Sequence, residues 1–300
     1  MNKRTLAILA ATGAAVIYGL NHTIAKGVMP KYVQPFGFIF LRVTGAMILF
    51  WLVSLFTPKE RIQRSDWWRL LGCAVGGMSL NMLAFFKGLS YSTPVYSSVL
   101  STITPILVFI LSSFLIDEKM TLRKGLGILL GFGGALVLVL MGNETRADAP
   151  NIFLGNLLFI FNACIFGVYL ILVKPLTQKY STITLMKYLF LIGFVINLPV
   201  TYGEFLEIDW QNMPFEGWWK ICFVVIGTTF FTYLLNVYAM RQLAASTIGA
   251  FIYLQPLIAI VYAVSTGYGT LSLDKITGAA LVFSGVYLVT QKKKHPVNKE

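Results

Sequence analysis

A few charged or titratable residues fall inside the otherwise apolar stretches of this sequence. Arg42 and Lys87 could each bind an anionic group, and His22 could exchange a proton near neutral pH. A charged side chain in an apolar helix costs about 2.5–3.5 kcal/mol, so it should face protein or water. In a simpler interpretation, Arg42 anchors helix packing or extends to the polar membrane interface, and Lys87 also extends to that interface. His22 would then only form a hydrogen bond within the protein. Lys26 is expected at such an interface.

Amides, hydroxyls and aromatic rings form a second group, near the middle of the apolar stretches. Together they suit a small zwitterion or a flat metabolite, although each amide could equally hold two helices together. The candidate substrate-binding residues are Asn21, His22, Arg42, Asn81, Phe85, Lys87, Thr102, Asn162, Tyr169, Tyr233, Asn236, Tyr253 and Gln255.

Patterns typical of catalysis and of metal or cofactor binding are missing from the sequence. No Ser/His/Asp, Cys/His or nucleotide-binding motif is present, and Cys73, Cys164 and Cys222 have no metal-site spacing. We therefore expect no enzyme activity, no cofactor and no metal. No Asp or Glu lies inside an apolar stretch, which favours facilitated diffusion or exchange over proton antiport.

Composition shows which elements must position these residues. Hydrophobic residues make up 57% of the 300 positions and charged residues only 12%, whereas soluble domains carry about 25%. Apolar runs of about 20 residues can cross the bilayer core as helices. The sequence thus predicts an all-α integral membrane protein. Its ten spans are expected near residues 5–27, 34–56, 68–91, 93–116, 122–141, 152–173, 182–203, 217–240, 243–265 and 273–290.

The chain also contains two similar halves. From the pairs Trp67-Trp68 and Trp218-Trp219 onward the offset is 151 positions, and Gly76 matches Gly227 as Pro105 matches Pro256. Before these pairs the offset is 148, and Lys31-Tyr32 matches Lys179-Tyr180. Each copy holds five spans, and an odd number forces the second copy to enter from the opposite side. We expect inverted repeats at 1–145 and 146–300. The partners Phe85/Asn236, Thr102/Tyr253 and Thr104/Gln255 should face each other across the pseudo-axis.

Lys and Arg in the connections predict the orientation. Most of them fall on the side that also holds both termini, while the other side receives only Lys26, Lys31, Arg146, Lys220 and Lys275. By the positive-inside rule, both termini are cytoplasmic in a multi-pass protein of the cell (inner, plasma) membrane. This asymmetry explains the net charge of +12, so no nucleic-acid partner is expected. The expected partners are the lipid bilayer and a small-molecule substrate; the sequence leaves monomer and homodimer open.

Several motifs together resemble the EamA-type, ten-span branch of the drug/metabolite transporter superfamily. They are Tyr18-Gly19-Leu20-Asn21, Arg42 with Gly45-Ala46, the run 86–91, Thr104-Pro105, Asp117-Glu118, Gly125-x-Gly127, Gly133-Gly134, Gln255-Pro256, and Gly278 to Gly285. The resemblance covers residues 5–290. It departs from the family at Tyr18, where Trp is common, and at Gly269, where an acidic residue is common.

The resemblance implies a secondary transporter that moves amino acids, related metabolites or drugs, often outward, by alternating access. The cations Arg42 and Lys87 favour an alternative, in which the substrate is a carboxylate or a phosphorylated compound. A different class, a non-transporting membrane sensor or an integral enzyme, stays open as a further alternative.

Overall fold

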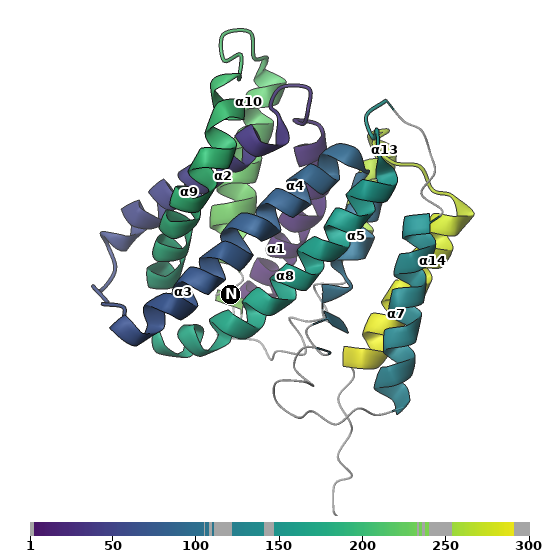
Figure 1. Ribbon diagram of the computed structural model, residues 1–300, viewed down its shortest axis with the longest axis horizontal. Helices are drawn as coiled ribbons and strands as arrows, with labels where there is room; N and C mark the ends of the chain where they lie inside the picture. Colours follow the sequence, from purple (N-terminus) through teal and green to yellow (C-terminus); the bar gives the residue numbers. More distant parts are fainter. Residues whose placement is uncertain are drawn as a thin grey trace, which may run out of the picture.

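The computed structural model describes residues 3–104, 106–107, 110, 122–140, 147–232, 234–235, 238–239 and 254–290. Each of the ten predicted spans contains helix within these ranges, which confirms the all-helical fold class (Figure 1). The helices are α1 (Lys3–Lys26), α2 (Pro35–Ser54), α3 (Trp67–Cys73), α4 (Asn81–Tyr91), α5 (Pro94–Ser101), α7 (Leu122–Leu140), α8 (Ile152–Lys179), α9 (Thr182–Leu206), α10 (Phe215–Cys222), α13 (Leu254–Ser265) and α14 (Leu273–Thr290). Two π-helical segments, η2 (Ala74–Leu80) and η3 (Phe223–Phe231), and a 3-10 turn, η1 (Arg64–Asp66), complete the described elements.

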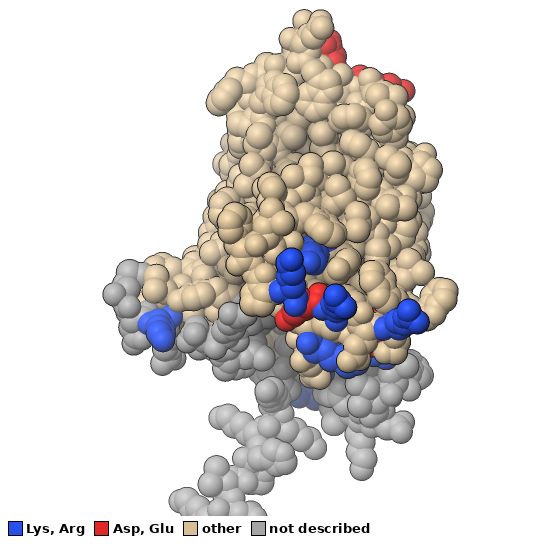
Figure 2. Space-filling view, turned by 90° about the vertical axis from the view of Figure 1, so that its left-hand side faces the viewer, with Lys and Arg blue, Asp and Glu red and all other residues tan. Residues whose placement is uncertain are grey.

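Local sequence signals start several of these helices. Pro35 and Pro94 stand at the first turns of α2 and α5, where proline needs no hydrogen-bond donor. The side chains of Asn151 and Ser181 cap α8 and α9 by accepting from Leu154 and Thr184 backbone N–H groups. Within the residues that the structure describes, five segments are long and apolar enough to cross a membrane: Thr5–Lys26, Pro35–Ser54, Arg64–Tyr91, Ile152–Lys179 and Thr182–Leu206. On the face shown in Figure 2, Lys and Arg gather toward one end, as expected of a membrane protein.

Helix packing follows the inverted repeat. In the first copy the spans are α1, α2, α3 to α4, α5 and α7; in the second they are α8, α9, α10 to η3, α13 and α14. α1 packs against α13, and the equivalent pair, α8 and α5, also packs. η2 packs against α8 as η3 packs against α1, while α2 pairs with α9 and α7 with α14. Exchanging the two copies thus reproduces the set of contacts, as a pseudo-two-fold axis requires.

Glycines bring α7 and α14 close together inside this chain. A Cβ added to Gly134 would lie 2.7 Å from the Gly278 carbonyl oxygen, and one added to Gly285 would lie 2.5 Å from the Gly127 carbonyl oxygen. Gly127 matches Gly278 and Gly134 matches Gly285 at the offset of 151, so the two contacts are images of each other. Spans five and ten therefore pack tightly against each other within this chain.

The two π-helical segments occupy matching places in the third span of each copy. At the same offset, η2 corresponds to residues 225–231, which lie within η3. α9 packs on η2 and α2 packs on η3, so the second span of each copy crosses the π-helical segment of the other. Gly193 on α9 lies against Met78, and its repeat partner Gly45 on α2 lies against Val225. π-helical turns often mark functional positions in long helices.

Candidate functional site

Four helices meet around His22, which lies on α1. Its Nδ1 is 2.8 Å from the Ser97 hydroxyl oxygen on α5, in a buried hydrogen bond. The Phe85 ring of α4 lies edge-on to the imidazole, with 5.5 Å between ring centroids. The Phe85 ring also packs against the Phe159 ring of α8, with 5.9 Å between the ring centroids. We call these residues, His22, Ser97, Phe85 and Phe159, the four-helix junction.

One helical turn from Phe85 and Phe159, two amides join α4 to α8. Asn162 Nδ2 donates to the Asn81 carbonyl oxygen at 2.9 Å, and Asn81 Nδ2 donates to the Asn162 carbonyl oxygen at 3.4 Å. Both amides therefore serve as interhelical bonds in this conformation. Further along α8, Tyr169 stacks on Phe166 and covers Gly77 of η2.

Arg42 is buried where α2 crosses η3. Its Nε donates to the Thr229 hydroxyl at 2.9 Å, and its guanidinium lies 5.3 Å from the centre of the Phe86 ring. Both contacts are typical of a cation held inside protein, so Arg42 does not reach a polar interface here. Beside it, the Asn21 side-chain oxygen accepts a hydrogen bond from the Thr228 hydroxyl at 3.1 Å.

The equivalent crossing in the other half also carries a polar bond. Where α9 crosses η2, Asn197 Nδ2 donates to the Met78 carbonyl oxygen at 3.0 Å. Met78 and Thr229 are repeat partners at the offset of 151. The two crossings thus lie at matching places, and a side-chain hydrogen bond joins the helices at each. The donor is the cation Arg42 at one crossing and the neutral amide of Asn197 at the other.

The remaining candidates lie elsewhere. Lys87 is half-buried near the end of α4, with its ammonium 4.8 Å from the Tyr91 ring centre and 5.5 Å from that of Phe36. The Thr102 hydroxyl donates to Val99 and that of Thr104 to Ser101, so each bonds to its own chain segment. Gln255 has its backbone carbonyl against Gly19. Tyr233, Asn236 and Tyr253, and Pro105, lie outside the described residues.

Lys26 differs from the expectation that it lies at a polar interface. The side chain is buried, and the ammonium donates to the carbonyl oxygens of Leu89 at 2.8 Å and Ser90 at 3.1 Å. It also donates to the Asp148 carbonyl oxygen. The carbonyls at the end of α4 satisfy a buried cation here, so the end of α1 is fastened to the end of α4.

Sequence reasoning missed Ser97, Thr228, Thr229 and Asn197. The Ser97-Ser98 and Thr228-Thr229 doublets stand out within apolar runs, and Thr228-Thr229 matches Gly77-Met78 in the repeat register. The doublets could have drawn attention to Ser97, Thr228 and Thr229, whereas Asn197 stands alone in its apolar run. The described residues contain no group of three or more His, Cys, Asp or Glu side chains that could hold a metal.

A cavity of about 250 Å³ lies between α5, α13 and α14. Apolar side chains and Lys275 line it, including Val95, Ile260, Leu271, Ala279 and Phe283. None of the candidate residues is among its lining, so this cavity is separate from the four-helix junction.

Comparisons with known proteins agree on one family. A model of the EamA-like transporter family matches residues 5–140 and 153–291. The chain is 24% identical to the uncharacterized transporter YetK of Bacillus subtilis (strain 168) over 99% of this chain and 90% of that one. It is 26% identical to an uncharacterized transporter of Archaeoglobus fulgidus, over 98% and 99%. The WAT1-related protein At3g53210 of Arabidopsis thaliana is 23% identical over 92% and 80%. A solved crystal structure aligns with a TM-score of 0.60 and 19% identity, covering 95% of this chain and 96% of that one, which shows the same fold.

Proposed function

Because one family model matches both halves, the chain belongs to the EamA-like transporter family, and we propose that it moves small organic metabolites by alternating access. It is a multi-pass membrane protein of a transporter family, not of an enzyme family. In the proposal, both termini are cytoplasmic, the membrane is the cell membrane, and the usual direction is outward.

The observation that carries the proposal is the set of polar and aromatic side chains buried inside an apolar, two-fold bundle. The four-helix junction offers an imidazole, a hydroxyl and two aromatic rings, and the amides of Asn81 and Asn162 lie one turn away. Such a mixture suits a small amphipathic solute such as an amino acid or a related metabolite. Helices on both sides of the pseudo-axis contribute to it, as a site at a repeat interface requires.

A second candidate function is transport of an anionic metabolite. The buried guanidinium of Arg42 supports it, because Arg can bind a carboxylate or phosphate with two parallel hydrogen bonds. Lys87 supports it less, since its ammonium lies among aromatic rings near the end of α4. We place the neutral or zwitterionic substrate first.

Counterflow in proteoliposomes tests the proposal without knowledge of the energy source. Vesicles with purified protein would be loaded with one unlabelled solute and given the same solute labelled outside, across a panel of neutral amino acids, organic acids and phosphorylated metabolites. We expect at least one solute to enter several-fold faster than into protein-free vesicles, with no requirement for a pH gradient.

Heat-treated protein in the same lipid is the matched control. If no solute in the panel moves while circular dichroism shows the helices intact, the result counts against transport and favours the sensor alternative. If only the anions move, the second candidate function replaces the first.

A further inference from the structure

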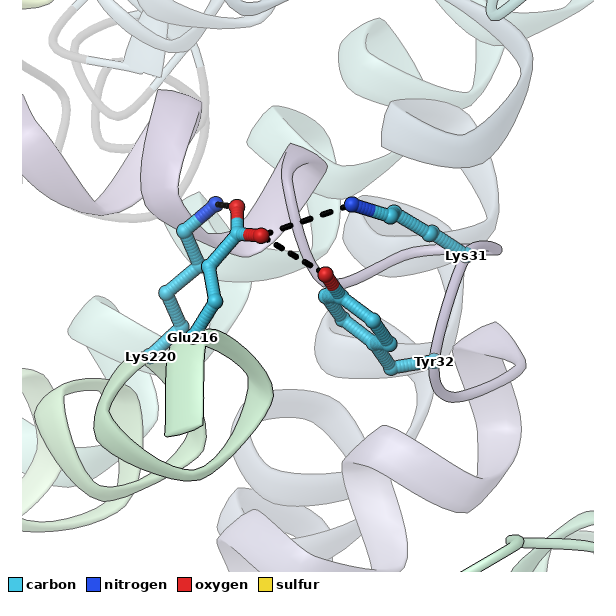
Figure 3. Close-up of polar contacts among 4 residues, drawn as sticks. All are labelled: Lys31, Tyr32, Glu216 and Lys220. Atoms are coloured by element: carbon cyan, nitrogen blue, oxygen red, sulfur yellow. Dashed lines mark hydrogen bonds and ion pairs between the residues drawn. The ribbon is translucent and has the colours of Figure 1, made fainter. Parts of the chain in front are cut away.

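A tyrosine and a lysine from one copy hold a carboxylate of the other copy at one end of the molecule (Figure 3). The Tyr32 hydroxyl donates to Glu216 Oε2 at 2.7 Å, and Lys31 Nζ lies 3.4 Å from the same oxygen. Lys220 Nζ lies 2.5 Å from Glu216 Oε1. Hydrogen bonds from Lys220 and Tyr32 lower the pKa of Glu216 to about 2, so the carboxylate is ionised at neutral pH. We call Lys31, Tyr32 and Glu216 the first latch.

The same arrangement is repeated with the copies exchanged. The Tyr180 hydroxyl donates to Asp66 Oδ2 at 2.8 Å, and Lys179 Nζ lies 3.1 Å from that oxygen. Lys179-Tyr180 is the repeat partner of Lys31-Tyr32. Asp66 directly precedes α3, as Glu216 stands in the first turn of α10, and these helices begin the third span of each copy. We call Lys179, Tyr180 and Asp66 the second latch.

Each latch is accompanied by another carboxylate that joins the copies. Glu204, at the end of α9, accepts from the backbone N–H groups of Phe36 at 2.6 Å and Gly37 at 3.0 Å, in the first turn of α2. Glu60, beyond the end of α2, accepts from the Ser181 N–H at 2.9 Å, at the start of α9. The pKa of Glu60 is lowered mainly by this bond. At both ends of the molecule, a carboxylate of one copy therefore accepts hydrogen bonds from backbone N–H groups of the other copy.

The two latches lie at opposite ends of the bundle. In Figure 1, α10 stands at the top and α3 begins at the bottom left. Both latches are closed in this conformation. In the first latch, 45% of the Glu216 side chain and 60% of the Lys31 side chain are accessible; in the second, 47% of Lys179 is accessible but Asp66 is buried, with 6% accessible. In each latch the lysine is open to water, and an ion pair with such a lysine is weak, so either latch can open without unfolding the protein.

We infer that the two latches are positioning devices of the transport cycle, opened one at a time, so that opening either one stabilises the closed form of the other. The inference rests on the proposed alternating access and names the residues that hold each end shut. Two inverted copies that rock about one axis separate at one end while they approach at the other. Latches of the same kind at both ends keep the two open states close in free energy, which rapid exchange between them needs.

Hydrogen–deuterium exchange on the full-length protein in lipid nanodiscs tests this coupling. In Glu216→Gln, we expect amide exchange in residues 28–36 and 213–220 to rise about threefold or more, because the charge-assisted bonds are lost. Exchange in residues 62–66 and 178–183 should fall at the same time, by a similar factor. Asp66→Asn should give the mirror image. A contact with a merely structural role would change exchange only at its own end.

Asp209→Asn is the matched control, because Asp209 carries the same charge but bonds to Asn212 and Gln211 of its own loop. It should leave both ends unchanged. Should Glu216→Gln or Asp66→Asn fold poorly, Tyr32→Phe and Tyr180→Phe remove only a hydroxyl and must show the same mirrored pattern. Increased exchange at the substituted end with no decrease at the other end would overturn the inference. Mirrored exchange in a protein that moves no solute in the panel would support the latches and overturn transport instead.

Discussion

Replacing Gly134 with alanine should destabilise the protein strongly, although it adds a single methyl group. The new Cβ would lie 2.7 Å from the Gly278 carbonyl oxygen and 2.7 Å from the Val282 nitrogen, which are backbone atoms of α14. Backbone cannot turn aside as a flexible side chain can, so α7 and α14 must separate. Overpacking of this kind costs about 1–3 kcal/mol and sometimes more. Thermal unfolding in detergent should show a loss of several degrees.

The neighbouring glycine supplies the control. A Cβ on Gly133 would meet nothing within 4 Å, so Gly133→Ala should be neutral or slightly stabilising, since alanine favours helix by about 1 kcal/mol over glycine. Two alanine substitutions at adjacent positions should therefore differ clearly in their effect on stability. Equal effects would contradict the close contact between α7 and α14.

Replacing Arg42 with methionine should reduce solute flux about tenfold or more while leaving the protein folded. A hydrogen bond from a charged donor contributes about 1.5–3 kcal/mol, and 1.4 kcal/mol corresponds to a tenfold change. The substitution removes the bond that joins α2 to η3, but Thr229 keeps its hydrogen bond to the Val224 carbonyl. Because a buried charge is also removed, the melting temperature should stay level or rise. Counterflow and thermal unfolding on the same preparation measure both quantities.

Lys87→Met is the matched control, since it removes a cation of the same copy that lies outside the crossing with η3. We expect its flux to remain within about twofold of the unchanged protein, because exposed or half-exposed charges contribute little. Unchanged flux in Arg42→Met would mean that Arg42 only anchors packing. Loss of flux in both variants, for anions alone, would favour the anionic substrate.

The fold followed from the sequence because it depends on signals that repeat along the chain. Apolar runs of span length predicted the helices, and the register of Gly76 with Gly227 and Pro105 with Pro256 predicted two copies. The π-helical segments were not predicted, since no local residue pattern distinguishes η2 or η3 from ordinary helix. The boundary between repeats at 145 and 146 stays a prediction.

The candidate site was predicted only in part, because periodicity does not say which faces of two helices meet. His22 and Phe85 were both chosen, but Ser97, which bonds to His22, was not. The register also matched Lys31-Tyr32 with Lys179-Tyr180, yet their carboxylate partners come from the other copy and depend on tertiary packing. The facing of Phe85/Asn236, Thr102/Tyr253 and Thr104/Gln255 stays a prediction.

The central claim is that the protein moves solute by opening its two ends in turn, and reversible cross-linking tests it most directly. The variants are Tyr32→Cys with Glu216→Cys, and Tyr180→Cys with Asp66→Cys, in a chain whose Cys73, Cys164 and Cys222 are replaced by alanine. Either pair, bridged by a bifunctional methanethiosulfonate reagent in proteoliposomes, should lower counterflow to that of protein-free vesicles, and a reductant should restore it. Full flux with either latch bridged would contradict the claim.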